Sequence, residues 1–306
     1  MNSSTTGRDL YCLARFRRPD GEASFGLLAA GDVIDLSGQL PLDDGSGHVS
    51  DMRELLAAIG THAKRLDELV DPRVSELFRW SLDDVTLLAP VTPPHLLCVG
   101  LNYPDHAEEA GLKAPEFPDV FVKLGGSVIG TGEPILVPEF RCRIDFEGEL
   151  AVVIGKGGRN IRQEDVHRHI AGFTVANDVT ARDIQVRTGQ WTLGKSIDGF
   201  GPIGPWIVAA EWDHVPDFDL CVRVNGEQVQ QGSTARMFFS VEEIVEYISR
   251  YVTLAPGDVI LTGTPAGVGA FRRPRLWLQS GDVVEVEVDG IGVLSNTVVG
   301  TAADGG

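Results

Sequence analysis

The chain has 306 residues, of which 43% are hydrophobic and 23% are charged, as in ordinary globular proteins. This length allows one large domain plus a small one, and global disorder is excluded. The formal net charge is −18 at pH 7. No run of Lys or Arg offers the basic stripe that a phosphate backbone requires, so we expect no nucleic-acid partner. The acidic excess is expected on solvated faces, where it favours solubility, and a bound cation can reverse the charge of a site locally.

Four cysteines are present without a CxxC pair, at Cys12, Cys98, Cys142 and Cys221. This spacing indicates neither a zinc ribbon nor a redox motif, and free thiols in a reducing compartment are expected. The N-terminus lacks a basic segment followed by an apolar one, and no apolar run approaches the roughly 20 residues of a membrane helix. The sequence therefore predicts a cytoplasmic protein with no membrane segment.

The first part of the chain, residues 1–86, is predicted to form a small α+β domain. Its short apolar stretches are separated by turn residues and predict a β-meander over Leu10–Phe16, Ala23–Leu28 and Val33–Leu36. Ser50 is expected to cap a helix that runs to Ile59 and stops at Gly60, and a second helix is expected over residues 62–70. Proline recurs between Ala89 and Pro94, where neither a helix nor a central strand can continue, so we expect the domain boundary there.

The second part, residues 87–300, is predicted to be mostly β, as a mixed roll or sandwich of α+β class. Strand-like runs recur at Leu96–Val99, Val120–Lys123, Leu150–Ile154, Ile207–Val208, Leu220–Val224, Val259–Thr262, Val283–Val288 and Gly292–Val299. Helices are predicted after Asn102, at Glu164–His169 and at Val241–Tyr251. Residues 301–306 are expected to form a flexible tail.

The segment from Asp145 to Ile154 carries the sharpest chemical signal in the chain. Side chains of a strand alternate between faces, so Asp145, Glu147 and Glu149 are predicted to project together. Three carboxylates on one face repel each other unless water or a cation neutralises them. The spacing alone fits a metal site and a solvated strand edge equally well. Asp178 is a further candidate ligand, because it lies in an otherwise apolar run where an unpaired carboxylate is costly.

Five stretches of the chain, taken together and in order, resemble the fumarylacetoacetate hydrolase superfamily. They are LLCVGLNYPDHAEEAG (96–111), DFEGELAVVIG (145–155), GFTVANDVTARDIQ (172–185), QWTLGKSIDGFGPIGP (190–205) and LAPGDVILTGTPAGVG (254–269). The likeness extends from about Leu87 to Val299. It implies the mixed β-sandwich roll of that family behind a small N-terminal α+β domain, and it implies a homodimer.

The resemblance also implies roles for the acidic residues and their neighbours. It assigns Glu147, Glu149 and Asp178 as ligands of one Mg²⁺ or Mn²⁺, with Ca²⁺ as a substitute in crystals, and it leaves Asp145 in a supporting position. Arg182 and Gln185, placed one and two helical turns after Asp178, and Lys195 are implied to line the substrate pocket. An ordinary salt bridge of Arg182 with Asp183 or another carboxylate is the alternative.

A candidate general base lies in the segment Asn102–Gly111. A capping Asn102, an early proline and the terminal Gly111 predict a helix of about two turns. His106 and Glu109 are three residues apart, so they share a face and can hydrogen-bond. A lone surface histidine is usually unremarkable, but the resemblance implies that this pair activates water on a short lid helix.

Three further residues are implied to contact the substrate or remain open. Lys123 resembles a pocket lysine of the family, although the following Leu-Gly-Gly departs from the family pattern and a solvated lysine is the alternative. Thr264, in a turn that is generic by itself, resembles a residue that binds a substrate carboxylate. Arg236 either contacts a distal acid group of the substrate or faces solvent.

These residues imply a metal-dependent enzyme that acts on a small 2-oxo or 2,4-dioxo carboxylic acid. Hydrolysis of a C–C bond in an acylpyruvate, with His106, Glu109 and Lys195 as catalytic residues, is our first expectation. Decarboxylation or isomerisation of oxaloacetate or a 2-oxo-alkenedioate on the same site is the runner-up. A non-catalytic binding module is a remote alternative, because a degenerate site has no reason to keep several charges together.

Overall fold

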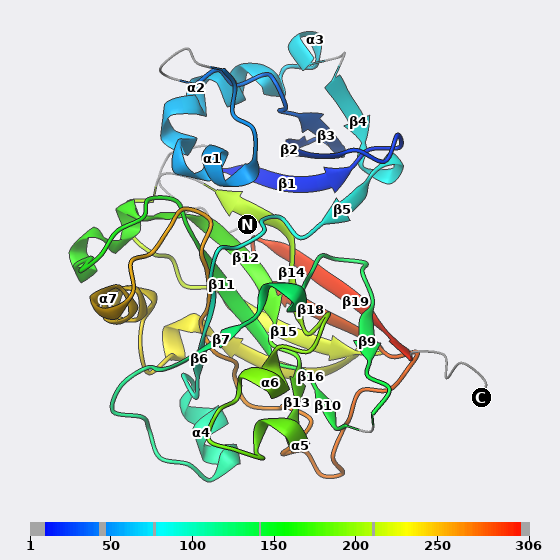
Figure 1. Ribbon diagram of the computed structural model, residues 1–306, viewed down its shortest axis with the longest axis vertical. Coiled ribbons are helices and arrows are strands. Elements are labelled where there is room, and N and C mark those ends of the chain that lie inside the picture. The colour runs from blue at the N-terminus through cyan, green and yellow to red at the C-terminus, as the bar shows by residue number, and fades with distance from the viewer. Residues whose placement is uncertain (1–9, 43–46, 76–77, 141, 210–211, 301–306) are drawn as a thin grey trace.

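The computed structural model describes residues 10–42, 47–75, 78–140, 142–209 and 212–300. A small N-terminal unit is stacked on a larger β-rich unit (Figure 1). The short helices α4 (Pro104–Ala110), α5 (Arg182–Gln185) and α6 (Thr192–Lys195) lie toward the far end of the larger unit. The predicted tail at residues 301–306 lies outside the described residues. No helix within the described residues is long and apolar enough to cross a membrane.

The N-terminal unit is a meander of antiparallel strands with helices packed beside it. Its elements are β1 (Tyr11–Arg17), β2 (Ala23–Ala29), β3 (Asp32–Asp35), α1 (Met52–Ala57), α2 (Ile59–Val70), α3 (Pro72–Ser75), β4 (Arg79–Ser81), η2 (Leu82–Asp84) and β5 (Thr86–Leu88). The predicted meander is confirmed. Strand β5 spans the boundary expected between residues 86 and 87 and pairs with β1.

The predicted boundaries of the first helices are wrong in detail. Asp51, not Ser50, caps α1, and its side chain accepts hydrogen bonds from the amides of Arg53 and Glu54. Helix α1 ends at Ala57, and Ala58 separates it from α2. Gly60 therefore does not stop the first helix but lies in the first turn of α2. An exposed glycine is tolerated there at a cost of about 1 kcal/mol relative to alanine.

The larger unit contains most of the strands of the chain. Its elements are β6 (Leu96–Gly100), α4 (Pro104–Ala110), β7 (Asp119–Lys123), η3 (Gly125–Ser127), β8 (Val128–Ile129), β9 (Ile135–Val137), β10 (Ile144–Asp145), β11 (Gly148–Ile154), η4 (Gln163–Arg168), β12 (Ile170–Asn177), β13 (Thr180–Ala181), α5 (Arg182–Gln185), α6 (Thr192–Lys195), β14 (Gly201–Ala209), β15 (Asp219–Val224), β16 (Glu227–Ser233), η5 (Thr234–Arg236), α7 (Val241–Tyr251), β17 (Val259–Leu261), β18 (Val283–Val288) and β19 (Gly292–Gly300). Every predicted strand is present, and the protein is a mostly β member of the α+β class.

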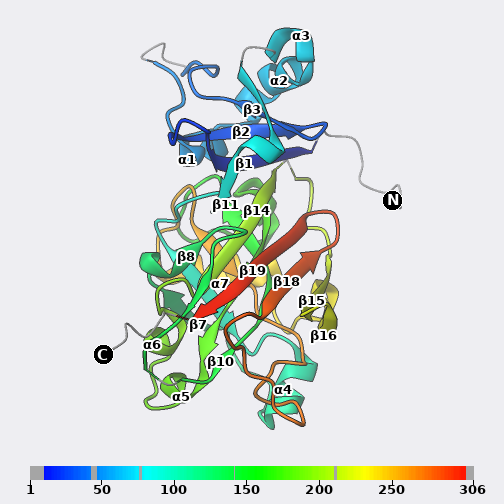
Figure 2. The same ribbon diagram turned by 90° about the vertical axis from the view of Figure 1, so that its right-hand side faces the viewer.

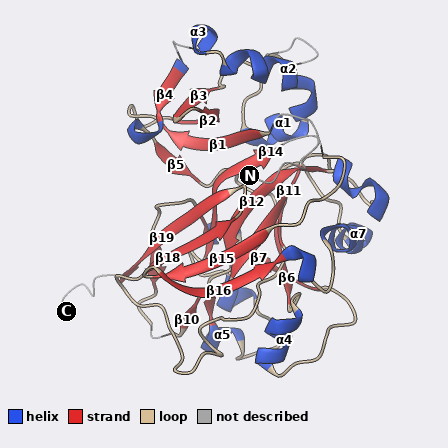
Figure 3. Ribbon diagram, turned by 180° about the vertical axis from the view of Figure 1, so that it is seen from behind, coloured by secondary structure: helices blue, strands red, loops and turns tan. Residues whose placement is uncertain are grey.

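Two sheets organise the molecule. The larger has the order β4-β3-β2-β1-β14-β12-β11-β17-β6-β7, so it continues from the N-terminal unit into the larger unit through the antiparallel pair β1 and β14. The second sheet has the order β16-β15-β18-β19-β9 and packs against the first (Figures 2 and 3). Strands β11 and β12 lie in the middle of the larger sheet and are buried along their whole length. Their ends therefore provide a fixed base for the polar groups beyond them.

Candidate metal centre

Three acidic side chains meet at one end of the central strands. Glu147 directly precedes β11, Glu149 is its second residue, and Asp178 directly follows β12. The antiparallel register places Gly148 opposite Asn177, which brings these acids to the same end of the ladder. Their carboxylate oxygens lie within 4.8 Å of one another, and the residues are buried, with exposures of 5%, 2% and 1%. The structure thus brings together the ligands that the sequence predicts.

Backbone hydrogen bonds hold these acids in register. The amide of Asp178 donates to the carbonyl of Glu147 at 2.8 Å, and the amide of Glu147 donates to Oδ1 of Asn177 at 3.0 Å. The amide of Gly263 donates to Oε2 of Glu149 at 2.6 Å. The spacing of the carboxylates is therefore set by the fold rather than by flexible side chains alone.

Asp145 does not join this group, so the expectation from strand alternation is wrong at that position. The strand is interrupted: β10 ends at Asp145 and pairs with β13, while β11 begins only at Gly148. Alternation between faces applies within one continuous strand and not across such a break. Asp145 is fully buried and accepts a hydrogen bond from Arg182 instead.

Two buried lysines reach into the carboxylate group. Nζ of Lys195 lies 2.6 Å from Oε2 of Glu147 and 2.5 Å from Oδ2 of Asp178. Nζ of Lys123 donates to Oδ1 of Asp178 at 2.6 Å and to the carbonyl of Val179 at 3.1 Å. The lysines are only 2% and 3% exposed. Lys123 is therefore not the solvated side chain that the sequence left open.

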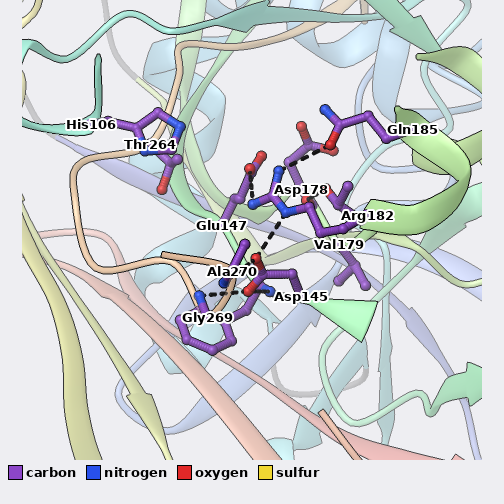
Figure 4. A network of polar contacts seen from close by, with 12 residues as sticks. His106, Asp145, Glu147, Asp178, Val179, Arg182, Gln185, Thr264, Gly269 and Ala270 are labelled. Atoms are coloured by element: carbon purple, nitrogen blue, oxygen red, sulfur yellow. Dashed lines mark hydrogen bonds and ion pairs between the residues drawn. The ribbon is translucent and has the colours of Figure 1, made fainter. Parts of the chain in front are cut away.

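Arg182 closes the network on the other side (Figure 4). It donates through Nε to Oδ2 of Asp145 at 2.8 Å, through Nη2 to Oε1 of Glu147 at 2.5 Å and through Nη1 to Oε1 of Gln185 at 3.2 Å. Its ion pairs are thus with these acids and not with Asp183. The two-turn helical spacing from Asp178 is also wrong, because β13 intervenes and α5 starts at Arg182 itself.

The cluster contains more negative than positive groups. Its carboxylates and cations are Asp145, Glu147, Glu149 and Asp178 against Lys123, Arg182 and Lys195. Burial raises the pKa of Glu147, but the charges of Arg182 and Lys195 outweigh it and hold the pKa well below its ordinary value. Burial and the carboxylates of Asp178 and Glu147 raise the pKa of Glu149 well above its ordinary value. The charged form of Glu149 is therefore the one that the lack of a counter-charge destabilises.

The donor set fits a hard divalent cation. The facing groups are carboxylate oxygens, which Mg²⁺ and Mn²⁺ prefer, and neither His nor Cys belongs to the group. Among the described residues, no cation forms an ion pair with Glu149. A divalent ion held by Glu147, Glu149 and Asp178 would supply that counter-charge and make the cluster attractive to an anionic substrate.

The predicted base lies on α4, opposite the carboxylates. Nδ1 of His106 lies 2.8 Å from Oε1 of Glu109, and His106 is 6% exposed. A carboxylate only accepts hydrogen bonds, so this contact requires the proton on Nδ1 and leaves Nε2 as an acceptor. Oε2 of Glu109 in turn accepts the amide of Gly267 at 3.0 Å.

The ends of α4 differ from the prediction on one side only. Gly111 ends the helix in the left-handed conformation with φ of 69°, as expected of a terminal glycine. The N-cap, however, is Tyr103 and not Asn102. The side-chain Nδ2 of Asn102 instead donates to the carbonyls of Phe239 and Thr262, which anchors the start of the helix to the body of the protein.

A cavity of about 180 Å³ joins the carboxylates to the base. Its lining residues are Val99, Gly100, Leu101, His106, Ala110, Leu112, Phe121, Glu147, Glu149, Asp178, Arg182, Gln185, Val186, Trp191, Lys195, Thr264 and Phe271. Three residues named in the sequence analysis are not among the described residues that line the cavity: Glu109, Lys123 and Arg236. Glu109 contacts the cavity residue His106, and Lys123 contacts the cavity residue Asp178. The side chain of Arg236 is 63% exposed and lies 3.8 Å from Asp105.

Thr264 is at the cavity wall, but its hydroxyl already has partners. It donates to the carbonyl of Gly148 at 2.9 Å and accepts from Nε2 of Gln230 at 2.8 Å. Gln230 is 2% exposed, and its Oε1 accepts the amide of Gly148. The sequence analysis did not find Gln230, since nothing in its local pattern distinguishes it from other polar residues of an edge strand.

Aromatic residues of the cavity were also missed. The ring of Phe121 lies 5.0 Å from Nζ of Lys195 and 5.4 Å from the ring of Trp191. A cation over an aromatic face is stabilised by about 0.5–2 kcal/mol. Phe121 could have been found from its spacing, because it is two residues from Lys123 and so lies on the same face of β7.

Comparison with known proteins identifies the family. Residues 95–299 match the domain family described as fumarylacetoacetate (FAA) hydrolase C-terminal. The chain belongs to the fumarylacetoacetate hydrolase family. The human mitochondrial oxaloacetate tautomerase FAHD2A is 48% identical over 222 residues, which cover 71% of this chain and 70% of that protein.

Solved structures of the fumarylacetoacetate hydrolase family show the same fold over nearly the whole chain. Fumarylacetoacetate hydrolase from Exiguobacterium antarcticum is 39% identical with a TM-score of 0.78, and covers 95% of this chain and 100% of its own. The 2-hydroxyhepta-2,4-diene-1,7-dioate isomerase from Mycobacterium marinum is 34% identical with a TM-score of 0.73, and covers 95% and 99%. The predicted fold class is confirmed, and the protein is an enzyme of this family.

Proposed function

We propose that the protein is a divalent-metal-dependent tautomerase of a small 2-oxo dicarboxylic acid, with oxaloacetate as the first candidate. One observation carries the proposal: a histidine that contacts the carboxylate of Glu109 through Nδ1 shares a cavity with three carboxylates suited to a divalent ion. The names of the relatives support the order of the candidates, because the human relative is an oxaloacetate tautomerase and a structural relative is an isomerase.

The size of the cavity supports a small substrate. Its volume is about 180 Å³. Ligand pockets for larger molecules range from about 300 Å³ upwards. The polar side of the cavity includes Arg182 and Lys195, which can pair with carboxylates of a substrate. The other side of the cavity is apolar and includes Leu112, Val186 and Phe271. A compact acid whose charges lie close together fits this distribution better than a long diacid with a distant second carboxylate.

Tautomerisation moves one proton between carbon 3 and the oxygen on carbon 2 of the acid. A divalent ion on Glu147, Glu149 and Asp178 would act as a Lewis acid toward the keto oxygen. Arg182 and Lys195 orient the carboxylates of the substrate and offset charge that develops on that oxygen. Lys195 stays protonated for this task, because the carboxylates of Asp178 and Glu147 raise its pKa more than burial lowers it.

His106 carries the proton. Its Nε2 is free to accept the proton from carbon 3, while Nδ1–H remains bonded to Glu109 and stabilises the resulting imidazolium. The same nitrogen then returns the proton to the oxygen on carbon 2. Substrate and product have the same atoms, so neither water nor a further reactant is consumed.

Hydrolysis of an acylpyruvate is the second candidate, and the hydrogen-bonded pair of His106 and Glu109 is the observation that favours it. The same Nε2 would take a proton from water, which attacks the remote carbonyl. Decarboxylation of oxaloacetate would need neither water attack nor proton abstraction from carbon 3. A binding module without catalysis is disfavoured by family membership and by the complete set of charged groups.

An NMR time course with Mg²⁺ or Mn²⁺ separates these reactions. Deuterium exchange at carbon 3 of oxaloacetate in D₂O, together with the rate of enol disappearance, reports tautomerisation. Pyruvate with CO₂ reports decarboxylation, and pyruvate with a carboxylic acid reports acylpyruvate hydrolysis. We expect enzyme-dependent keto–enol interconversion to exceed both alternatives. Interconversion no faster than in metal-containing buffer would remove the proposal.

Three accompanying expectations belong to the same proposal. Mg²⁺ or Mn²⁺ is the expected ion, on the oxygen ligands described above. The expected location is the cytoplasm, and the expected assembly is a homodimer. Sedimentation and cell fractionation test the last two.

A further inference from the structure

Asp145 is the buried acid of the cluster for which the family resemblance implies only an unspecified supporting position and to which the proposed reaction gives no task. It is fully buried and is not among the described residues that line the cavity. Among the described residues, the hydrogen-bond partners of its oxygens are all N–H groups. Oδ1 accepts the amides of Phe146 at 2.9 Å and Gly269 at 2.7 Å, and Oδ2 accepts the amide of Ala270 at 2.9 Å and Nε of Arg182 at 2.8 Å (Figure 4).

One of these contacts leads into the carboxylate group. Arg182 is held by Asp145 through Nε and presents Nη2 to Glu147 and Nη1 to Gln185. A planar guanidinium is fixed in orientation when separate nitrogens are bound on different sides. The direction in which Arg182 points at Glu147 and at the cavity therefore depends on Asp145.

The other contacts lead to the base. The loop held by the amides of Gly269 and Ala270 continues into Phe271, whose ring lies 6.1 Å from the ring of His106. The loop is closely packed, since a Cβ on Gly269 would lie 1.8 Å from the carbonyl oxygen of Leu276 and 2.6 Å from Oδ1 of Asp145. Asp145 thus contacts both Arg182, on the carboxylate half of the site, and the loop before Phe271, on the half that contains His106. It does not itself line the cavity.

We propose that Asp145 is a positioning residue that aligns the two halves of the site, by orienting Arg182 toward Glu147 and by fixing the loop that places Phe271 against His106. The proposal rests on the proposed function only in taking this cavity as the reaction site. Its test uses measurements that need no substrate.

Asp145→Asn is the informative variant, because it keeps the shape and removes both the charge and half of the acceptors. Within the described part of the chain, each hydrogen-bond partner of the side chain is an N–H donor. In either orientation of the asparagine amide, its NH₂ group faces two N–H donors. The two hydrogen bonds on that side of the side chain are therefore lost.

The first measurement is the dissociation constant of Mn²⁺ by calorimetry in a double-mutant cycle. We compare the wild type, Asp145→Asn, Arg182→Gln and the double variant. Outer-shell partners cost about 10–100-fold in metal affinity, and we expect Asp145→Asn to weaken Mn²⁺ binding in that range. In the Arg182→Gln background the same change should weaken it by less than about threefold, since contacting residues are not additive. Equal effects in both backgrounds would overturn the Arg182 arm of the proposal.

The second measurement is hydrogen exchange at the amides of Gly269 and Ala270. We expect exchange to be at least about tenfold faster in Asp145→Asn and unchanged in Arg182→Gln, where Asp145 still accepts both amides. Unchanged exchange in Asp145→Asn would overturn the loop arm.

Asp258→Asn is the matched control. Asp258 is also fully buried and accepts the amides of His95 at 3.0 Å and Ala255 at 2.8 Å, but it lies at the opposite end of β17 from Thr264. It should lower the melting temperature without altering Mn²⁺ affinity. If Asp258→Asn weakens Mn²⁺ binding as much as Asp145→Asn, the effect is general destabilisation and the proposal is wrong.

The two proposals fail separately. A protein that shows the coupled Mn²⁺ affinities but does not interconvert oxaloacetate tautomers retains the positioning role and loses the proposed reaction. A tautomerase with additive Mn²⁺ affinities and unchanged exchange retains the reaction and loses the positioning role.

Discussion

The carboxylate group and the helix that carries the base are attached to the protein in different ways. Glu147, Glu149 and Asp178 lie at the ends of fully buried strands. Helix α4 is short, lacks a side-chain N-cap and docks through Asn102 and through the bond from Gly267 to Glu109. The fold itself fixes the charges, while a few hydrogen bonds position the base. Changes to the former should disturb metal binding and stability together, and changes to the latter should disturb turnover alone.

Removal of a carboxylate should give the largest effect. Glu147→Ala takes away one predicted ligand and leaves Lys195 with only Asp178, and Arg182 with only Asp145, as carboxylate partner among the described residues. We expect Mn²⁺ affinity and turnover to fall by more than the roughly 100-fold typical of supporting residues. Stability should fall as well, because two buried cations each lose one of their two carboxylate partners. Calorimetry and thermal melts measure both.

The control for this change is Glu287→Ala, which removes an ion pair with Arg223 whose side chains are 36% and 35% exposed. Such a pair contributes about 0–1 kcal/mol. Stoichiometric Mn²⁺ binding by Glu147→Ala would refute its assignment as a ligand.

Removal of the base should separate turnover from metal binding. His106→Ala should lower kcat by about 10²–10⁴-fold, the usual contribution of general acid–base catalysis, and leave the dissociation constant of Mn²⁺ unchanged. His95→Ala is the comparison, since His95 also pairs with a carboxylate but is not among the described residues of the cavity. Retained turnover in His106→Ala would take His106 out of the mechanism.

Glu149→Gln should stabilise the metal-free protein while removing its response to metal. The pKa of Glu149 is raised in the folded state, so its carboxyl contributes most stability below about pH 4.3, the ordinary value. That contribution is lost as the pH rises through the folded-state pKa. At pH 7 the metal-free variant should therefore melt about 2–4 °C higher, equivalent to about 1 kcal/mol.

Thermal melts with and without Mn²⁺ check this directly. The wild type should gain stability with excess Mn²⁺ by about 2.7 kcal/mol at 100 times the dissociation constant, and Glu149→Gln should gain little. A lower melting temperature of the metal-free variant at pH 7 would contradict the charge imbalance described above.

The smallest effect is expected at Arg236. Its side chain is 63% exposed, and its Nη2 lies 3.8 Å from Oδ2 of Asp105. This distance is long for an ion pair. Arg236→Ala should change stability by less than about 0.5 kcal/mol and leave kcat/KM unchanged. A tenfold rise in KM for any 2-oxo acid would show that Arg236 contacts the substrate.

The sequence predicted the elements that follow simple periodicity or turn chemistry. The strands that were predicted in the larger unit, the helix Val241–Tyr251 and the end of α4 at Gly111 are where they were expected. Strand β12 was missed although it is central, because a run that is buried on both faces shows no alternation. Strand β16 was missed for the opposite reason, since it is a polar edge strand.

The site was predictable as a set of residues but not as a network. The approach of Asp178 to Glu147 depends on the register of β11 with β12, which one sequence does not contain. The interruption between β10 and β11 separates Asp145 from its neighbours and cannot be seen in an uninterrupted acidic pattern. The partners of Arg182 follow from the same break, so long-range contacts account for each error.

The most direct test of the account is a crystal grown with Mn²⁺ and measured at an energy where manganese scatters anomalously. We expect one anomalous peak for each chain, with oxygens of Glu147, Glu149 and Asp178 within about 2.0–2.6 Å of it. A peak elsewhere in the chain, or a site without a peak in which these carboxylates bind only Lys123, Lys195 and Arg182, would contradict it.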